Sequence, residues 1–263
     1  MKKSLLALSL IILMFGCSKD EEKTKVYSPR VLTKNESFNH YPEKKGDSIT
    51  LYQSVDPKEG GLMIIKFRDS SISIQADPKK ASNRFSFAEY INSQKTALLV
   101  QIADENGLAA PSFIISLKDG VGLEVVSLDR ETKPGPGEKA GMGLSRLGRT
   151  GHLVNNDYFI RGVTGKAYVL KRQDPEQRID GKFLLLSPDR NTIVFAAPKA
   201  LYQVNYIADE TSTLPLPGDQ PATLAVVYND VQNNYSFQTN KQGVSFLKKN
   251  DNDKIVDISD FKK

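Results

Sequence analysis

The sequence predicts an all-β or mainly β fold: an antiparallel multi-sheet domain, sandwich-like or partly propeller-like, with one short helix. Two observations support this prediction. Short apolar or alternating runs rich in Val, Ile, Phe and Tyr recur along the chain, and Gly, Pro, Asn and Asp separate them. Turn sequences at Asp104–Gly107 and Lys118–Gly120 follow such runs, which indicates hairpins and therefore antiparallel strand pairs.

The predicted strands are short segments of four to eight residues. They cover Ser48–Val55, Leu62–Arg68, Ser71–Gln75, Thr96–Ala103, Ser112–Leu117, Gly122–Leu128, Tyr158–Arg161, Lys166–Lys171, Lys182–Ser187, Thr192–Ala197, Leu201–Ile207, Thr223–Tyr228, Tyr235–Thr239 and Val244–Lys248. The segment Ala81–Gln94 is predicted to be the helix, because Phe87, Tyr90 and Ile91 are spaced to share one helix face.

One segment favours a propeller-like arrangement. In Phe183–Phe195 the turn sequence Ser187–Asp189 separates two apolar runs, and this resembles a strand-turn-strand unit of a β-propeller blade. No internal repeat of about 40 to 50 residues is visible beside it. The sequence therefore leaves a sandwich-like domain and a propeller-like domain open.

The N-terminus has the layout of a signal peptide. Lys2 and Lys3 precede an apolar run, Leu5–Phe15, which only Ser9 interrupts. This run is shorter than the roughly 20 apolar residues that a helix needs to cross a bilayer. We therefore expect residues 1–16 to direct export and to be removed.

The residues Leu13–Cys17 resemble the lipobox of bacterial lipoproteins. The resemblance implies cleavage between Gly16 and Cys17 and attachment of acyl chains to Cys17, so that the membrane becomes a partner of the chain. Cys17 is the single cysteine among 263 residues. Lipidation would therefore leave no thiol for a disulfide or a metal site.

Polar residues follow Cys17, and they predict a disordered lipidated tether over residues 17–25 and a β-rich domain over residues 26–263. The second mature residue resembles that of proteobacterial outer-membrane lipoproteins. The lysine and acidic run behind it resemble the surface-export signal of Bacteroidota lipoproteins, with an ordinary solvated linker as the alternative. The candidate sorting residues are Ser18, Lys19, Asp20, Glu21 and Glu22. The expected location is the bacterial outer membrane, facing the periplasm or the surface.

Charge argues against a nucleic-acid partner. The chain carries 36 basic and 31 acidic residues, a formal net charge of +5, and removing the signal peptide takes away two lysines. Both signs are interspersed, which is typical of an ordinary soluble surface and not of a nucleic-acid footprint.

A Gly-rich stretch, residues 133–151, contains six glycines and two prolines, and we expect no regular strand or helix across it. One interpretation is an anion-binding or partner-binding loop in which backbone N–H groups act with Arg146, Arg149 and His152. The alternative, which the composition favours, is a solvated connection between two halves of the domain.

The sequence contains no recognisable catalytic or metal-binding motif, and it implies no cofactor. His40 and His152 are its only histidines, and Gly143–Leu147 lacks the second glycine of a nucleophile elbow. Tyr202 and Tyr206 share a predicted strand face with Val204, so a glycan platform is one interpretation and a buried aromatic row the other.

The sequence leaves three functions open. The first is a non-catalytic binding or assembly module with a protein partner in the cell envelope, for which a small ligand or a glycan stays an alternative. The second is a periplasmic immunity lipoprotein that inhibits a toxic effector enzyme. The third is an envelope hydrolase with dispersed acidic residues. The sequence does not decide whether the chain is an enzyme, but the lack of catalytic signatures favours the first function.

Overall fold

A computed structural model describes residues 23–44, 46–55, 60–77, 80–103, 110–133, 143–216 and 223–250. The predicted signal peptide, Cys17 and the candidate sorting residues lie outside these ranges. So do residues 134–142 of the Gly-rich stretch and the predicted turn Asp104–Gly107.

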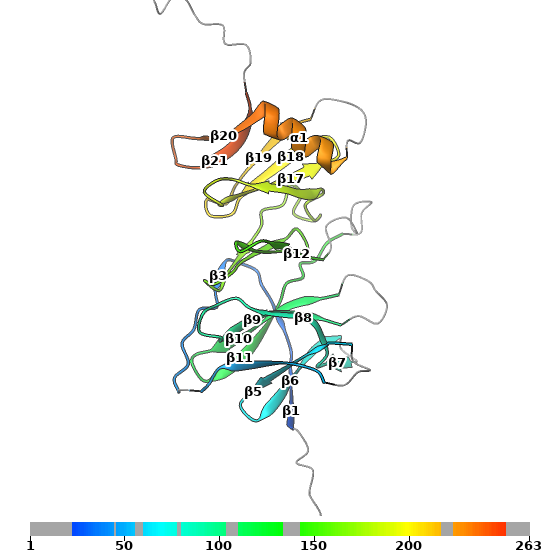
Figure 1. Cartoon of the computed structure of the whole chain (residues 1–263), viewed down its shortest axis with the longest axis vertical. Coiled ribbons are helices and arrows are strands. Elements are labelled where there is room, and N and C mark those ends of the chain that lie inside the picture. Colours follow the sequence, from blue (N-terminus) through cyan, green and yellow to red (C-terminus); the bar gives the residue numbers. More distant parts are fainter. Residues whose placement is uncertain are drawn as a thin grey trace, which may run out of the picture.

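The mainly β prediction is confirmed: the described chain forms several sheets and one helix, stacked as layers along the long axis (Figure 1). The ten-stranded sheet forms the layer at the N-terminal end and curls around its own core (Figure 1). Its strands are β1 (Lys23–Tyr27), β2 (Arg30–Val31), β4 (Ile49–Gln53), β5 (Met63–Phe67), β6 (Ser70–Asp77), β7 (Lys80–Ser82), β8 (Phe85–Tyr90), β9 (Ala97–Ile102), β10 (Ser112–Lys118) and β11 (Gly122–Ser127).

Two smaller sheets follow along the stack. A five-stranded sheet packs on the ten-stranded sheet, and a four-stranded sheet packs on the five-stranded one. The five-stranded sheet contains β3 (Glu36–Ser37), β12 (Leu144–Leu147), β13 (Gly151–Val154), β14 (Tyr158–Arg161) and β15 (Lys166–Val169). The four-stranded sheet contains β16 (Lys182–Leu186), β17 (Thr192–Ala197), β18 (Ala200–Asn205) and β19 (Glu210–Pro215). Most strand pairs are antiparallel, and the parallel pairs β1–β6 and β2–β11 attach the N-terminal strands.

Helix α1 (Leu224–Asn234) and the terminal hairpin of β20 (Tyr235–Thr239) and β21 (Ser245–Lys249) cover the far face of the four-stranded sheet (Figure 1). Part of this contact is polar. The side-chain amide of Gln203 donates to the carbonyl of Leu247 at 3.0 Å and accepts from its N–H at 2.7 Å. Gln203 therefore binds the backbone of β21 as a neighbouring strand would.

Every interface between layers contains its own hydrophobic core, and strands between two layers contribute to both. In β9, Leu98 and Val100 face the core inside the ten-stranded sheet, whereas Ala97 and Leu99 pack against the five-stranded sheet. In β14, Tyr158 faces one core and Phe159 the next. Successive side chains of a strand point to opposite faces, so these strands are buried on both sides.

The predicted helix at Ala81–Gln94 is wrong, because this segment contains strand β8. Phe87 and Ile91 belong to the core beside the five-stranded sheet, and Tyr90 packs against the opposite core. Apolar residues on both faces of the strand produced a spacing that resembles one helix face.

The helix of the structure lies instead at Leu224–Asn234, where the sequence predicts the strand Thr223–Tyr228. The Oγ1 of Thr223 caps the helix by accepting from the N–H of Val226, and Val227 and Val231 face the core under the helix. Tertiary packing has therefore overridden the β-propensity of the valines in this helix. Every other predicted strand overlaps a strand of the structure.

Two predicted boundaries also need correction. Strand β1 begins at Lys23 and pairs with β6, so the last three residues of the predicted tether, Lys23–Lys25, are part of the fold. Strand β12 lies within the Gly-rich stretch, where no regular strand was expected. Of the six glycines there, only those at 143, 148 and 151 flank β12 and its hairpin turn, so the strand itself contains none.

A buried charge cluster ties the chain together where the five-stranded sheet meets its flanking segments. Asp157 and Arg172 are almost fully buried and form a bidentate ion pair with two N···O distances of 2.7 Å. Arg172 also donates to the carbonyls of Glu131 and Pro175, at 3.0 and 2.9 Å. One guanidinium thus links β13–β14 to segments on both sides of the Gly-rich stretch.

Replacing Asp157 with asparagine is expected to lower the free energy of unfolding by about 3–5 kcal/mol, because the buried guanidinium of Arg172 would lose its counterion. Urea unfolding followed by circular dichroism measures the change. Lys133→Ala is the control, since it removes an exposed ion pair with Glu176 and should cost less than about 1 kcal/mol. Equal losses in the two variants would contradict this prediction.

Candidate functional site

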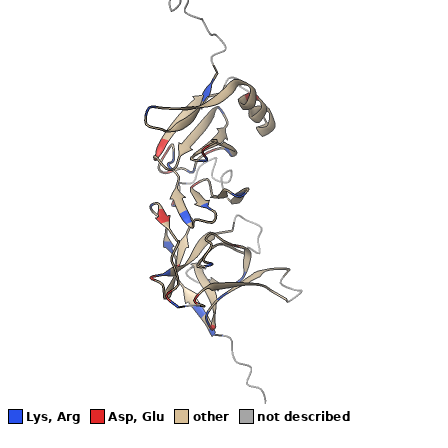
Figure 2. Cartoon of the chain, turned by 60° about the vertical axis from the view of Figure 1, so that its left-hand side comes forward, with Lys and Arg blue, Asp and Glu red and all other residues tan. Residues whose placement is uncertain are grey.

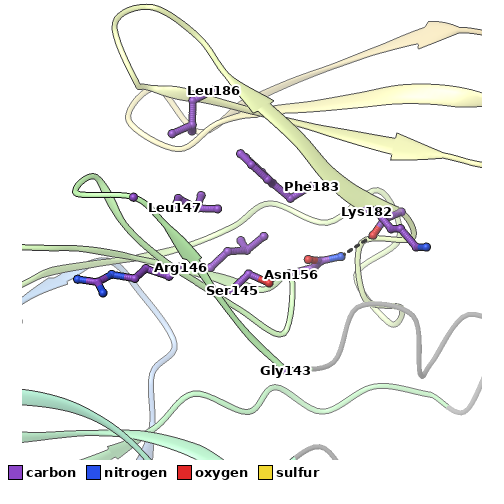
Figure 3. A pocket seen from close by; sticks show the side chains of 11 residues that line it. Gly143, Ser145, Arg146, Leu147, Asn156, Lys182, Phe183 and Leu186 are labelled. Atoms are coloured by element: carbon purple, nitrogen blue, oxygen red, sulfur yellow. Dashed lines mark hydrogen bonds between the residues drawn. The ribbon is translucent and has the colours of Figure 1, made fainter. Parts of the chain in front are cut away.

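The candidate site is a pocket of about 580 Å³ between the five-stranded and four-stranded sheets (Figure 3). It lies at β12 and β16, each of which pairs with a single neighbour within the described part of the chain. Its apolar lining consists of Leu147, Leu153, Phe183 and Leu186. The pocket is therefore an opening into the third core, the one that both sheets share.

A β-bulge in β16 aims two apolar side chains at this pocket. Phe183 pairs with Phe195, and the register then shifts so that Leu185 pairs with Val194 and Leu184 is the extra residue. In a regular strand, residues three apart point to opposite faces. Because of the shift, Phe183 and Leu186 both pack against the third core, and both point toward the facing sheet (Figure 3).

The polar part of the lining comes mainly from Ser145, Arg146, Asn156 and Lys182. Asn156 has a structural role: its amide donates to the carbonyls of Ile179 and Gly181, at 3.1 and 2.8 Å, so both of its N–H hydrogens are used. The exposed side chains of Ser145 and Lys182 remain at the pocket rim. The site therefore combines an apolar floor with a hydroxyl and an ammonium group.

Gly181 shapes the entrance to β16. Its φ of +128° is a backbone conformation that side chains disfavour, and a Cβ there would lie 2.8 Å from the carbonyl oxygen of Ala196. Only glycine lets the chain approach β17 this closely and still present its carbonyl to Asn156. The wall of the pocket thus depends on one residue without a side chain.

The structure brings Arg146 and His152 together, as the interpretation of the Gly-rich stretch as an anion-binding loop requires. They are paired in register on β12 and β13, and both contact Glu89 of β8: Arg146 at 3.1 Å and His152 Nε2 at 3.5 Å. The carboxylate of Glu89 therefore occupies the place that an external anion would take. Phe87 packs edge-on against the imidazole, 5.5 Å away.

Arg149 does not join this group. It lies exposed in the turn between β12 and β13, and no contact with Arg146, His152 or Glu89 is found within the described part of the chain. The three residues predicted from the sequence therefore do not converge on one anion. Arg146 alone among them lines the pocket.

Over the described residues, charges do not gather on one part of the molecule. Figure 2 shows Lys and Arg interspersed with Asp and Glu along the described chain. Within those described ranges, no group of three or more His, Cys, Asp or Glu residues could hold a metal ion. No described helix is long and apolar enough to span a membrane.

Tyr202 and Tyr206 are buried in the third core, where Tyr206 packs against Phe159 and Tyr168. Burial raises the pKa of Tyr202 and Tyr206 to about 12. Their hydroxyls donate to the carbonyls of Lys171 and Arg190. These tyrosines thus form the buried aromatic row and do not offer a sugar-stacking surface.

Sequence reasoning missed the pocket, although one signal was present. Phe183–Leu186 are four consecutive apolar residues at the edge of a sheet, whereas a strand exposed on one face alternates. Such a run indicates burial on both faces or a bulge. The paired cations of the Gly-rich stretch were visible, but Glu89 is distant in sequence and nothing near it indicated the contact.

Burial lowers the pKa of His152; nearby Arg146 adds to this effect and Glu89 opposes it. The unfolded chain therefore binds more protons than the folded chain as the pH falls below about 6.5, the ordinary histidine pKa, so stability is lost there. Above that pH the imidazole is neutral in both states.

His152→Leu is expected to remove this contribution. Its free energy of unfolding should fall less than that of the native chain between about pH 7.5 and about pH 5.5. Urea unfolding at both pH values measures this loss in each protein. Subtracting one loss from the other removes the contribution of the carboxylates, which the two proteins share. An equal loss in the two proteins would show that His152 does not couple folding to pH.

Comparisons with known proteins find no counterpart. No protein-family model, no curated protein and no solved structure matches the chain.

Proposed function

We propose that the chain is a non-catalytic binding module of the bacterial cell envelope, anchored through lipid on Cys17, and that the pocket between β12 and β16 binds its partner. The observation that supports this proposal is the pocket itself: a cavity with an apolar floor and a few polar groups at its rim. Cavities of this composition are typical of binding sites. Ser145, the hydroxyl at the rim, has no histidine or carboxylate contact within the described residues.

We infer a partner larger than a single small group, from the free energy that the pocket floor can supply. Burying one aliphatic side chain contributes about 1.5–3 kcal/mol, whereas association costs about 4–15 kcal/mol in lost translational and rotational freedom. Occupation of this floor alone would therefore give weak binding. A partner protein that also contacts the surface around the pocket supplies the remaining free energy.

The anchor and the fold are close in sequence. Only the five residues Ser18–Glu22 separate Cys17 from strand β1. Fully extended, they span less than about 20 Å. Because β1 lies at one end of the layered stack (Figure 1), lipid on Cys17 would hold the ten-stranded sheet near the bilayer and the pocket farther out.

Cys17→Ala is expected to abolish acylation and to leave the chain unprocessed. Metabolic labelling with a palmitate analogue and fractionation of the host membranes measure these two effects. Ser18→Ala is the control for a substitution beside the cleavage site, and it should still be labelled. Normal labelling of the Cys17→Ala protein would contradict the proposed anchor.

Ser145→Trp is expected to fill the pocket from its rim and to reduce partner capture at least tenfold, since it removes the space into which a partner group fits. Capture is measured by crosslinking in the native host, followed by quantitative mass spectrometry.

Thr213→Trp is the matched control, because Thr213 is an exposed residue of β19 at the opposite edge of the four-stranded sheet. This variant should capture the partner as the native chain does. Loss of capture in both variants, or in neither, would argue against the pocket as the binding site.

A further inference from the structure

At the mouth of the pocket, β12 presents backbone groups that bond to no other strand in the described part of the chain. The N–H of Asn155 donates to the carbonyl of Gly143 at 2.8 Å, and the N–H of Gly143 donates to the side-chain Oδ1 of Asn155 at 2.9 Å, so these two residues are bonded to each other next to the first pair of the ladder, Leu144 with Val154. Hydrogen-bonded pairs alternate with non-bonded pairs along a ladder. Ser145 and Leu147 are therefore bonded to β13, and the backbone groups of Leu144 and Arg146 point away from it.

Within the described residues, the five-stranded sheet ends at β12, and no backbone hydrogen bond joins Leu144 or Arg146 to a residue beyond that edge. Two N–H groups and two carbonyls thus have no backbone partner among the residues that the structure describes. A row of unpaired backbone groups is a template for an additional strand.

A strand added at this edge would have one face toward the pocket. The side chains of Ser145 and Leu147 on β12 point into it, and Phe183 and Leu186 line it from the facing sheet. Side chains of an added strand alternate between its two faces. Every second side chain would therefore enter the apolar floor, as in recognition by strand addition.

The other face of β12 and the rim of the pocket determine which charge the added strand should carry. The two charged residues that line the pocket, Arg146 and Lys182, are both cationic. Arg146 borders the pocket at its rim, but its guanidinium extends to the other face of β12, where it pairs with Glu89 and remains largely exposed. A residue directly across from Arg146 would form a cross-strand pair with it, and an acidic residue fits this position.

We propose that the partner binds through an extended segment that adds a strand to β12, with apolar residues facing the pocket and an acidic residue between them opposite Arg146. This inference rests on the proposed binding function and adds the chemistry of the partner. The segment is short, because β12 has four residues. Its main-chain groups bond to Leu144 and Arg146, and its apolar side chains take the place of water against Phe183 and Leu186.

The test begins with displayed peptides of about eight residues, the length of a short strand with flanks, selected against the whole mature chain. The expected result is an enriched pattern in which apolar residues alternate with polar ones and an acidic residue stands between two apolar ones. Selected sequences are synthesised, and their dissociation constants are measured by fluorescence anisotropy.

N-methylation then separates main-chain pairing from side-chain contact. Methylation of each peptide amide in turn should weaken binding about tenfold or more at every second position, where the N–H faces β12, and much less at the positions between. Equal effects at all positions, or no effect at any, would overturn strand addition. This scan leaves the protein unchanged, so it does not depend on the folding of a variant.

Two substitutions test the edge from the side of the protein. Arg146→Ala removes the guanidinium and keeps the outward N–H, whereas Arg146→Pro removes both; proline is tolerated where the N–H of an edge strand faces solvent. Peptide binding should be weakest in Arg146→Pro, whose dissociation constant should be severalfold or more above that of Arg146→Ala. Arg149→Ala, an exposed turn residue with the same charge, should bind as the native chain does. Equal binding by the two Arg146 variants would overturn the inference.

The failure of this inference differs from the failure of the proposed function. If no peptide is selected but lauric acid binds and Ser145→Trp prevents its binding, the pocket is a binding site for an acyl group and strand addition is wrong. If neither peptides nor laurate bind and Ser145→Trp leaves partner capture in the host unchanged, the proposed function fails as well.

Discussion

The arrangement of the layers depends on the ion pairs of one buried carboxylate, that of Asp157. Arg172 binds it in a bidentate manner, and the guanidinium of Arg178 lies 3.4 Å from it and is itself held by Asp129 at 2.6 Å. Arg130, 3.8 Å from the same carboxylate, donates to the carbonyl of Leu170. These arginines come from segments before and after the five-stranded sheet, so one charge fixes how the chain enters and leaves it. Burying such a group is costly unless every partner stays in place.

A second constraint comes from the burial of the middle layers on both faces. Each sheet between two others has no solvent-facing side, so its register must satisfy two cores at once. A shift of one residue in β14 would exchange Tyr158 with Phe159 and misplace both. The phenolic hydroxyl of Tyr158 also donates to the carbonyl of Leu32, at 3.2 Å, which ties the N-terminal segment to the same register.

The sequence predicted the strands well and the site in part, for physical reasons. Strand positions follow from local residue types, and β17 and β18 were found because they are β-branched and aromatic between clear turns. The helix at Leu224–Asn234 was missed because its character comes from the core beneath it. Arg146 was singled out by its setting among glycines. The pocket around it was not, because it depends on a one-residue bulge in β16 and on two sheets meeting face to face. Neither appears in a local pattern.

The bond between Gln203 and β21 has a consequence for how this chain can change in evolution. Gln203 contacts the main chain of Leu247, not its side chain, and Thr192 likewise donates to the carbonyl of Ser245. These contacts fix the alignment of the terminal hairpin but make no demand on which side chains it carries outward. The exposed positions of β20 and β21 can therefore change their side chains without weakening the contact with the four-stranded sheet. An insertion or deletion of one residue would shift the main chain of the hairpin and break these hydrogen bonds. Substitution is tolerated here and a change in length is not.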